Sequence, residues 1–344
     1  MDLSDASDSR LANLTRWVIE DLGFDGASVV PASVDASFRR YFRVTRDSDS
    51  FIVMDAPPDK EDSAPFLKVA RILGGMNLNV PIVLARDMER GFLLLSDLGS
   101  RQYLDALPED GAADRLYRDA LGALRTMQTT DAPGARDLPA YDRALLLREM
   151  ELLPEWFLQR HLGLRIAAEE RAMLDQLFDS LVHAAIEQPA TFVHRDYHSR
   201  NLLVTPRNNP GILDFQDAVW GPVTYDLASL LKDCYIAWPP ARVREWVLEY
   251  REKLLQAGFE LPADPKQFMR WFDLTGLQRH IKVLGIFARL FYRDGKSQYL
   301  RDLPRVLDYA RDTAARYAET RAFAGFIAKR IDVEFEDAQR RALA

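Results

Sequence analysis

Hydrophobic residues change from helical spacing to strand spacing within the first hundred positions. Over residues 9–22 they recur at helical intervals, which predicts an amphipathic helix that Gly23 ends. Short apolar runs between polar turns then predict strands. The expected strands begin near residue 29 and cover 41–45, 51–54, 81–85 and 91–96, with one helix over 64–73. The predicted order is therefore three strands, one helix and two strands.

Beyond residue 98 the apolar spacing is almost entirely helical. The expected helices cover about 100–106, 112–129, 142–160, 167–187, 224–236, 241–257, 266–292 and 303–330. Asp97-Leu98-Gly99 breaks the strand pattern, so we expect two lobes, residues 1–98 and residues 99–344. The pattern predicts an α+β fold with a small five-stranded antiparallel sheet lobe and a larger, mainly helical lobe. A cleft between two lobes is a usual place for a ligand.

One polar stretch interrupts the helices and lies between short apolar runs. Residues 191–193 lead into the octet from His194 to Asn201, and a second apolar run ends at Asp214. These runs predict short strands that carry Asp196, Asn201 and Asp214 at their ends. Asp196 can accept a proton from a hydroxyl, and Asn201 and Asp214 offer the hard oxygen atoms that Mg²⁺ prefers. The ordered set indicates phosphoryl transfer from ATP rather than ordinary turns, although Asp and Asn are common in turns.

Composition and charge narrow the class of protein. The chain has 344 residues, of which 48% are hydrophobic and 28% charged, as in soluble globular proteins. A formal net charge of −7 argues against a nucleic-acid partner. Cys234 is the single cysteine, so a reducing cytoplasm is expected. No apolar run approaches the ~20 residues of a membrane span, and no signal-peptide pattern occurs. We expect a cytoplasmic protein, bound to no membrane, with a monomer as the simplest oligomeric state.

The octet resembles a known family motif. His194-x-Asp196-x-His198-x-x-Asn201 is similar to the H-x-D-x-H-x-x-N motif of the aminoglycoside phosphotransferase and choline kinase-like enzymes. Asp214-Phe215-Gln216 stands where protein kinases have D-F-G. The resemblance implies a bilobal protein-kinase-like fold, whose small lobe has the strand and helix order expected above. It also implies a phosphotransferase that uses ATP and Mg²⁺, with Asp196 as general base and with Asn201 and Asp214 as metal ligands.

Further stretches are similar to the bacterial N-acetylmuramate/N-acetylglucosamine anomeric kinases of cell-wall sugar recycling. They are residues 35–42, 54–58, 215–218, 221–230 and 293–296. This likeness implies a small-molecule amino sugar as acceptor and its 1-phosphate as product. Arg279 or Lys282 could then pair with the lactyl carboxylate of a muramic acid. A kinase of another hydroxyl (of the aminoglycoside, choline or homoserine type) and a non-catalytic pseudokinase stay open. A protein kinase is disfavoured because no A-P-E segment follows Asp214.

Four residues of the small lobe are candidates for nucleotide binding. Ser37 and Arg39 lie in the turn that is expected over the phosphates, where a hydroxyl, a backbone N–H or a guanidinium could bind them. A plain hairpin turn is the alternative. Leu95 and Asp97 lie at the end of the fifth strand, in the expected hinge whose backbone would bind the adenine edge. That stretch could equally be a core strand followed by a turn.

The third strand departs from the family pattern. Protein kinases and antibiotic kinases keep a lysine there, which pairs with the phosphates. Residues 51–56 contain no lysine. Lys60 or Lys68 could reach in, Arg43 could substitute, or the metal ions could neutralise the phosphate charge alone. This difference is the reason that the pseudokinase alternative stays open.

Four other residues are candidates for contact with the acceptor, in addition to Asp196. Asp217 follows the expected metal ligand closely, and Trp220 could stack on a sugar ring. Glu149 and His280 lie on predicted helices of the large lobe. The alternatives are a core position for Trp220 and His280 and a solvated helix face for Glu149.

Overall fold

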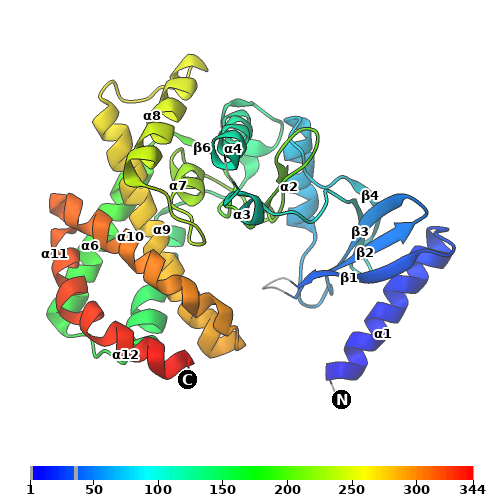
Figure 1. The fold of residues 1–344 in the computed structure, drawn as a ribbon, viewed down its shortest axis with the longest axis horizontal. Helices are drawn as coiled ribbons and strands as arrows, with labels where there is room; N and C mark the ends of the chain where they lie inside the picture. Colours follow the sequence, from blue (N-terminus) through cyan, green and yellow to red (C-terminus); the bar gives the residue numbers. More distant parts are fainter. Residues whose placement is uncertain (1–2, 35–37, 110, 344) are drawn as a thin grey trace. The chain divides into compact units, whose positions relative to one another are not determined.

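Figure 1 shows the fold as a computed structural model, which describes residues 3–34, 38–109 and 111–343. Ser37, a candidate for phosphate binding, lies outside these residues. Residue contacts divide the chain into two compact units. The first unit comprises Met1–Arg101 and Leu203–Asp217, and the second comprises Gln102–Leu202 and Ala218–Ala344. The lobe boundary expected between Leu98 and Gly99 stays a prediction.

The first unit is built on a five-stranded antiparallel sheet with strand order β1-β2-β3-β5-β4. The strands are β1 (Ser28–Val34), β2 (Arg40–Arg46), β3 (Asp49–Asp55), β4 (Val83–Asp87) and β5 (Phe92–Ser96). Helix α2 (Ala64–Gly75) lies between β3 and β4 in the chain. The predicted order of three strands, one helix and two strands is therefore confirmed.

One face of this sheet is buried because its strands alternate. In β2 the side chains of Phe42 and Val44 are buried, whereas Arg43 between them is not. Helix α1 (Leu3–Arg16) and the π-helical turn that follows it (Trp17–Asp21) contribute Leu14 and Trp17 to the same hydrophobic cluster. The amphipathic segment predicted over residues 9–22 therefore covers the apolar face of the sheet.

The second unit is mainly helical. Its helices are α3 (Tyr103–Ala106), α4 (Ala112–Thr129), α5 (Arg143–Met150), α6 (Ala168–Ile186), α7 (Tyr225–Leu231), α8 (Pro240–Gln256), α9 (Pro265–Asp294), α10 (Leu303–Arg316), α11 (Arg321–Phe326) and α12 (Asp332–Leu343). Strand β6 (Ala190–Val193) pairs with β9 (Val219–Pro222) in this unit. Another two-stranded sheet pairs β7 (Leu202–Leu203), which begins at the end of a segment of this unit, with β8 (Gly211–Ile212) of the first unit. In the described residues no helix is long and apolar enough to cross a membrane.

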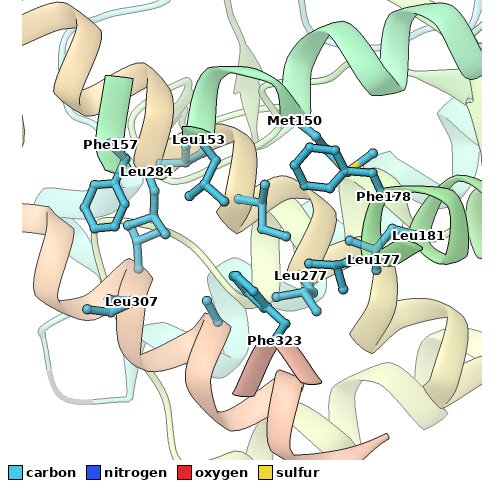
Figure 2. Close-up of a cluster of buried hydrophobic side chains, with 14 of the residues drawn as sticks. Met150, Leu153, Phe157, Leu177, Phe178, Leu181, Leu277, Leu284, Leu307 and Phe323 are labelled. Atoms are coloured by element: carbon cyan, nitrogen blue, oxygen red, sulfur yellow. The ribbon is translucent and has the colours of Figure 1, made fainter. Parts of the chain in front are cut away.

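Helix α9 forms the centre of the second unit. Every residue from Trp271 to Gly285 is buried, so this part of the helix has no solvated face. Figure 1 shows α10 running alongside it. Figure 2 shows its Leu277 and Leu284 in a cluster with Met150, Leu153, Phe157, Leu177, Phe178, Leu181, Leu307 and Phe323. Polar side chains on this stretch of α9 therefore require partners inside the unit.

The helix predicted over 142–160 is present but changes from an α-helix to a π-helix, whereas the helix predicted over 303–330 is interrupted, so its predicted extent is wrong. The segment 142–160 consists of α5 and a π-helix (Leu153–His161) with Pro154 in its first turn, where proline removes a backbone donor. The segment 303–330 breaks at Tyr317, whose backbone is extended with φ −113° and ψ 146°. The Tyr317 hydroxyl donates a hydrogen bond to Asp273 Oδ2 at 2.7 Å. This bond to the distant helix α9 stabilises the extended residue. The apolar spacing continues across Tyr317, so the sequence pattern alone does not show the break.

Glycine at position 285 allows α9 to approach the backbone of Leu152. An added Cβ would lie 2.4 Å from the carbonyl carbon of Leu152 and 2.5 Å from its oxygen. We expect Gly285→Ala to lower the free energy of unfolding by about 1–3 kcal/mol, because the two backbones must separate. Gly122→Ala in α4 is the control, since its added Cβ meets no described atom within 4 Å. The control should be neutral or stabilising by up to about 1 kcal/mol.

Urea unfolding of both variants and the parent measures these differences. A Gly285→Ala protein that unfolds at or above the parent's urea midpoint would contradict the close approach of the two segments.

Candidate active site

The octet His194–Asn201 follows strand β6, and a buried aspartate fixes its beginning. The backbone N–H groups of His194 and Arg195 donate hydrogen bonds to Asp226 at 2.6 and 3.0 Å. Asp226 lies in the first turn of α7 and is completely buried. Burial raises the pKa of its carboxyl to about 7, although the two donated hydrogen bonds act in the opposite direction. The side chain of Asp226 therefore holds the loop by binding the loop's backbone N–H groups.

Arg195 adopts a backbone conformation that is uncommon for a residue with a side chain. Its φ is +77°, in the left-handed region. Its guanidinium forms an ion pair with Glu149 of α5, which stabilises this conformation through a distant helix. The next residue, Asp196, donates its backbone N–H to Nδ1 of His194 at 3.3 Å. The sequence therefore forms a compact turn that holds Asp196 in place.

Glu149 is the centre of a buried charge network. Its carboxylate binds Arg195, the ammonium of Lys282 at 3.0 Å and the hydroxyl of Tyr141. Burial raises the pKa of Glu149, but the charges of Lys282 and Arg195 outweigh this effect, and the resulting pKa is below its usual value. Lys282 also lies 3.3 Å from the hydroxyl of Tyr225. The network carries two cations for one carboxylate, and it therefore leaves positive charge beside Asp196.

Asp196 is ionised because of these cations. Burial raises the pKa of its carboxyl, but charge interactions with Lys282, His198, Arg279 and Arg195 lower it to about 2. Asn201 donates its side-chain amide to the carbonyl oxygen of Asp196 at 3.0 Å. The Asp196 carboxylate can accept a proton from a hydroxyl, and the orientation of Asn201 presents its amide oxygen as a ligand atom.

Asp214 belongs to the first unit and shares one property with Arg195. Its φ is +62°, again in the left-handed region. Gln216 donates a hydrogen bond from Nε2 to Asp214 Oδ1 at 2.8 Å. Phe215 is buried and packs its ring on Phe66 of α2, with ring centroids 4.9 Å apart. The ring packing of Phe215 and the hydrogen bond from Gln216 therefore hold the D-F-x triplet in place.

The expected hinge is held by polar bonds of its own. Asp97 accepts hydrogen bonds from Arg43 Nε at 2.7 Å, from the Ser50 hydroxyl at 2.6 Å and from the Gly99 N–H at 2.8 Å. Burial raises the pKa of Asp97, but the hydrogen bonds from Arg43 and Ser50 have the larger effect, and the resulting pKa is below its usual value. Leu95 is buried in β5 opposite Ile52. Arg43, a candidate substitute for the missing lysine, is thus paired with the hinge aspartate.

The end of β3 carries a buried aspartate where a lysine was sought. Asp55 is completely buried and forms ion pairs with Arg10 of α1 and Arg40 of β2. Arg39, expected to bind phosphate, forms an ion pair with Glu61 at 3.1 Å. This role of Asp55 could not be predicted from local sequence, because its partners come from separate elements. Lys60 is exposed and lies 3.9 Å from Asp59.

The remaining acceptor candidates lie in different surroundings. His280 has its Nε2 at 3.0 Å from the carbonyl oxygen of Lys232 and its ring stacked on Tyr309. Burial lowers the pKa of His280 to about 3, which is typical of a core histidine. Trp220 is half-buried in β9 beneath the guanidinium of Arg136, and Asp217 is exposed. As contacts of an acceptor, all of these stay predictions, and so does Glu149, whose two oxygens both bind protein groups.

Residues 28–264 match the phosphotransferase enzyme family, APH. An N-acetylmuramate/N-acetylglucosamine kinase of Pseudomonas aeruginosa is 51% identical over 293 residues, which is 85% of this chain and 86% of that protein. A protein of the same name from Pseudomonas putida is 46% identical over 335 residues, 94% of this chain and 97% of that protein.

Two solved structures share the fold at low identity. ADP-bound aminoglycoside phosphotransferase APH(2'')-Ib has a TM-score of 0.58 at 14% identity, over 88% of this chain and 98% of its own. An ethanolamine kinase of Plasmodium vivax has a TM-score of 0.62 at 13% identity, over 91% of this chain and 89% of its own. The predicted protein-kinase-like fold is therefore confirmed.

The buried position of Glu149 predicts a large effect on stability. Glu149→Gln keeps the shape of the side chain but leaves Arg195 and Lys282 without a counter-charge, and we expect a loss of about 3–5 kcal/mol. Glu151→Gln is the matched control, because Glu151 pairs with Arg171 at the surface. That change should cost less than about 1 kcal/mol. Urea unfolding of both variants and the parent measures these losses in the free energy of unfolding. Losses of equal size in the two variants would contradict the buried network.

Proposed function

Because the chain belongs to the phosphotransferase enzyme family, we propose that it transfers the γ-phosphate of ATP to the anomeric hydroxyl of N-acetylmuramate or N-acetylglucosamine. Three relatives that carry these sugars in their names are 45–51% identical to this chain over most of its length. One observation of the site carries the chemistry. An ionised carboxylate, Asp196, lies on a loop that buried charges and hydrogen bonds hold in place.

Asp196 acts on the acceptor hydroxyl in this proposal. Its carboxylate accepts a hydrogen bond from the hydroxyl and orients the oxygen toward the γ-phosphorus. As the new oxygen–phosphorus bond forms, the bond from the γ-phosphorus to the bridging oxygen of ADP breaks, and the proton passes to Asp196. The products are the sugar 1-phosphate and ADP. The low pKa of Asp196 suits orientation of the nucleophile and late proton transfer, since a loose transition state needs little help from a strong base.

Asn201 and Asp214 supply ligands for Mg²⁺ in this proposal. Both offer hard oxygen atoms, and the bond from Gln216 fixes one oxygen of Asp214. In the described part of the chain no group of three or more His, Cys, Asp or Glu forms a metal site. That fits an ion that takes most of its ligands from phosphates and water. Magnesium bound with ATP would neutralise the charge that develops on the transferred phosphoryl group.

The nucleotide would take the remaining contacts from the first unit. The main chain near Leu95 and Asp97 would bind the adenine edge, with the bonds of Asp97 to Arg43 and Gly99 holding that turn. Arg39 would bring positive charge toward the phosphates, and its pairing with Glu61 would have to open or be shared. Without a lysine on β3, the metal ions carry a larger share of the phosphate neutralisation.

Asp196→Asn removes the proton acceptor and keeps the shape of the side chain. We expect kcat with N-acetylglucosamine to fall by about 10²–10⁴-fold. Asp179→Asn, at an exposed position of α6, should leave kcat unchanged. Coupled detection of ADP gives the rates, and ³¹P NMR identifies the phosphorylated hydroxyl.

Choline, homoserine and an aminoglycoside serve as competing acceptors. Equal turnover in the parent and Asp196→Asn would refute the assigned base. Turnover of one of these competitors, with neither amino sugar phosphorylated, would refute the proposed acceptor.

A further inference from the structure

Arg200 is a cation on the same loop as Asp196 that is neither deeply buried nor tightly paired. Its side chain is 34% exposed. Its guanidinium lies 3.6 Å from the ring centroid of Tyr235, at the distance of close stacking, and 6.0 Å from that of Tyr299. Stacking fixes the plane of the guanidinium while its N–H groups remain available at the edge. Arg200 is therefore oriented but not saturated.

The ion pair of Arg200 is long and shared. Its Nη2 lies 3.8 Å from Asp302 Oδ2, beyond hydrogen-bond distance, and the described residues offer it no other carboxylate. Asp302 already accepts a hydrogen bond from Arg305 Nη1 at 2.9 Å. Arg305 also donates to the carbonyl oxygen of Cys234 at 2.8 Å. Two guanidinium groups thus share one carboxylate, so the cluster of Arg200, Arg305 and Asp302 has an excess positive charge.

This cluster is tied to the turn that holds Asp196. Asp233 accepts the backbone N–H of Ser199 and that of Tyr235, both at 2.9 Å. The ring of Tyr235 also meets His198 edge to face, with centroids 5.3 Å apart. Arg200 follows Asp196 by four residues, so their Cα atoms are at most about 13–14 Å apart. An acceptor sugar at Asp196 would therefore lie within reach of the Arg200 side chain.

The other cations near Asp196 are more deeply buried than Arg200. Arg195 and Lys282 both bind Glu149. Arg279 is 3% exposed, with Nη1 at 3.2 Å from Cys234 Sγ. The expected pairing of Lys282 with a substrate carboxylate would compete with Glu149, and pairing with Arg279 would require the carboxylate to be buried beside it. Arg200 needs no such change.

We propose that Arg200 binds the lactyl carboxylate of N-acetylmuramate and so determines the preference of the enzyme for the acidic over the neutral amino sugar. This inference rests on the function proposed above. The lactyl group is attached to the pyranose ring away from the anomeric oxygen, so one residue can bind it while Asp196 orients the reacting hydroxyl. A guanidinium binds a carboxylate through two N–H groups, a geometry that the stack on Tyr235 leaves open.

The test compares three sugars in three variants and the parent. The sugars are N-acetylmuramate, its methyl ester, which lacks the charge, and N-acetylglucosamine, which lacks the lactyl group. The variants are Arg200→Met, Arg200→Lys and Arg301→Met, the last an exposed arginine close to Asp302 in sequence. The ratio of kcat/KM for N-acetylmuramate to that for N-acetylglucosamine cancels any common loss from folding or from the loop.

We expect Arg200→Met to lower this ratio by about 10–100-fold, the usual effect of losing a charged hydrogen-bonded partner. Arg200→Lys should give an intermediate ratio, and Arg301→Met the parental one. The ratio of kcat/KM for the methyl ester to that for N-acetylglucosamine should be the same in Arg200→Met as in the parent. Calorimetric binding of N-acetylmuramate and N-acetylglucosamine without nucleotide should show the same order among the variants.

A ratio in Arg200→Met within about twofold of the parent would overturn the inference, and so would an equal loss for the acid and its ester. A parent that phosphorylates both amino sugars while the variants fail to change the ratio refutes only the role of Arg200. A parent that phosphorylates none of the three sugars refutes the proposed function, and the inference with it.

Discussion

The carboxylate of Glu149 and its two cations hold the loop of Asp196 in place. Arg195 comes from the loop and Lys282 from α9, so one buried acid joins α5 to both. An isolated charge inside a protein is costly, and removing one partner of a buried pair leaves the others uncompensated. The network therefore constrains three segments that are far apart in the sequence.

The same network sets the charge state of the Asp196 carboxylate. Two cations against one anion leave positive charge next to Asp196, and Arg279 adds to it, which keeps the pKa of Asp196 at about 2 despite its burial. The strained backbone of Arg195 persists because its guanidinium is fixed by Glu149 and its N–H by Asp226. Position and ionisation of Asp196 thus have a common physical origin.

The local part of this site could be predicted from the sequence, and the non-local part could not. Asp196 and Asn201 lie five residues apart in one loop, so their spacing alone carries the pattern. Glu149 lies on helix α5, where sequence spacing allows a solvated position. Its buried carboxylate is paired with Lys282, which is more than a hundred residues away in the sequence. The order of strands and helix in the first unit was likewise predicted from local periodicity. The break at Tyr317 was not, because a bond to another helix holds it.

The acid side of the pH profile tests the claim that buried cations keep Asp196 ionised. With N-acetylglucosamine as a neutral acceptor and saturating Mg-ATP, kcat/KM reports the ionisation of the nucleotide-bound enzyme. A base with a pKa of about 2 stays deprotonated as the pH falls, so kcat/KM should remain constant from about pH 8 to about pH 5 while the protein stays folded. Because burial raises the pKa of Asp226 to about 7, the same profile is measured for Asp226→Asn. A tenfold fall per pH unit below an apparent pKa near 6–7 in both proteins would contradict the account.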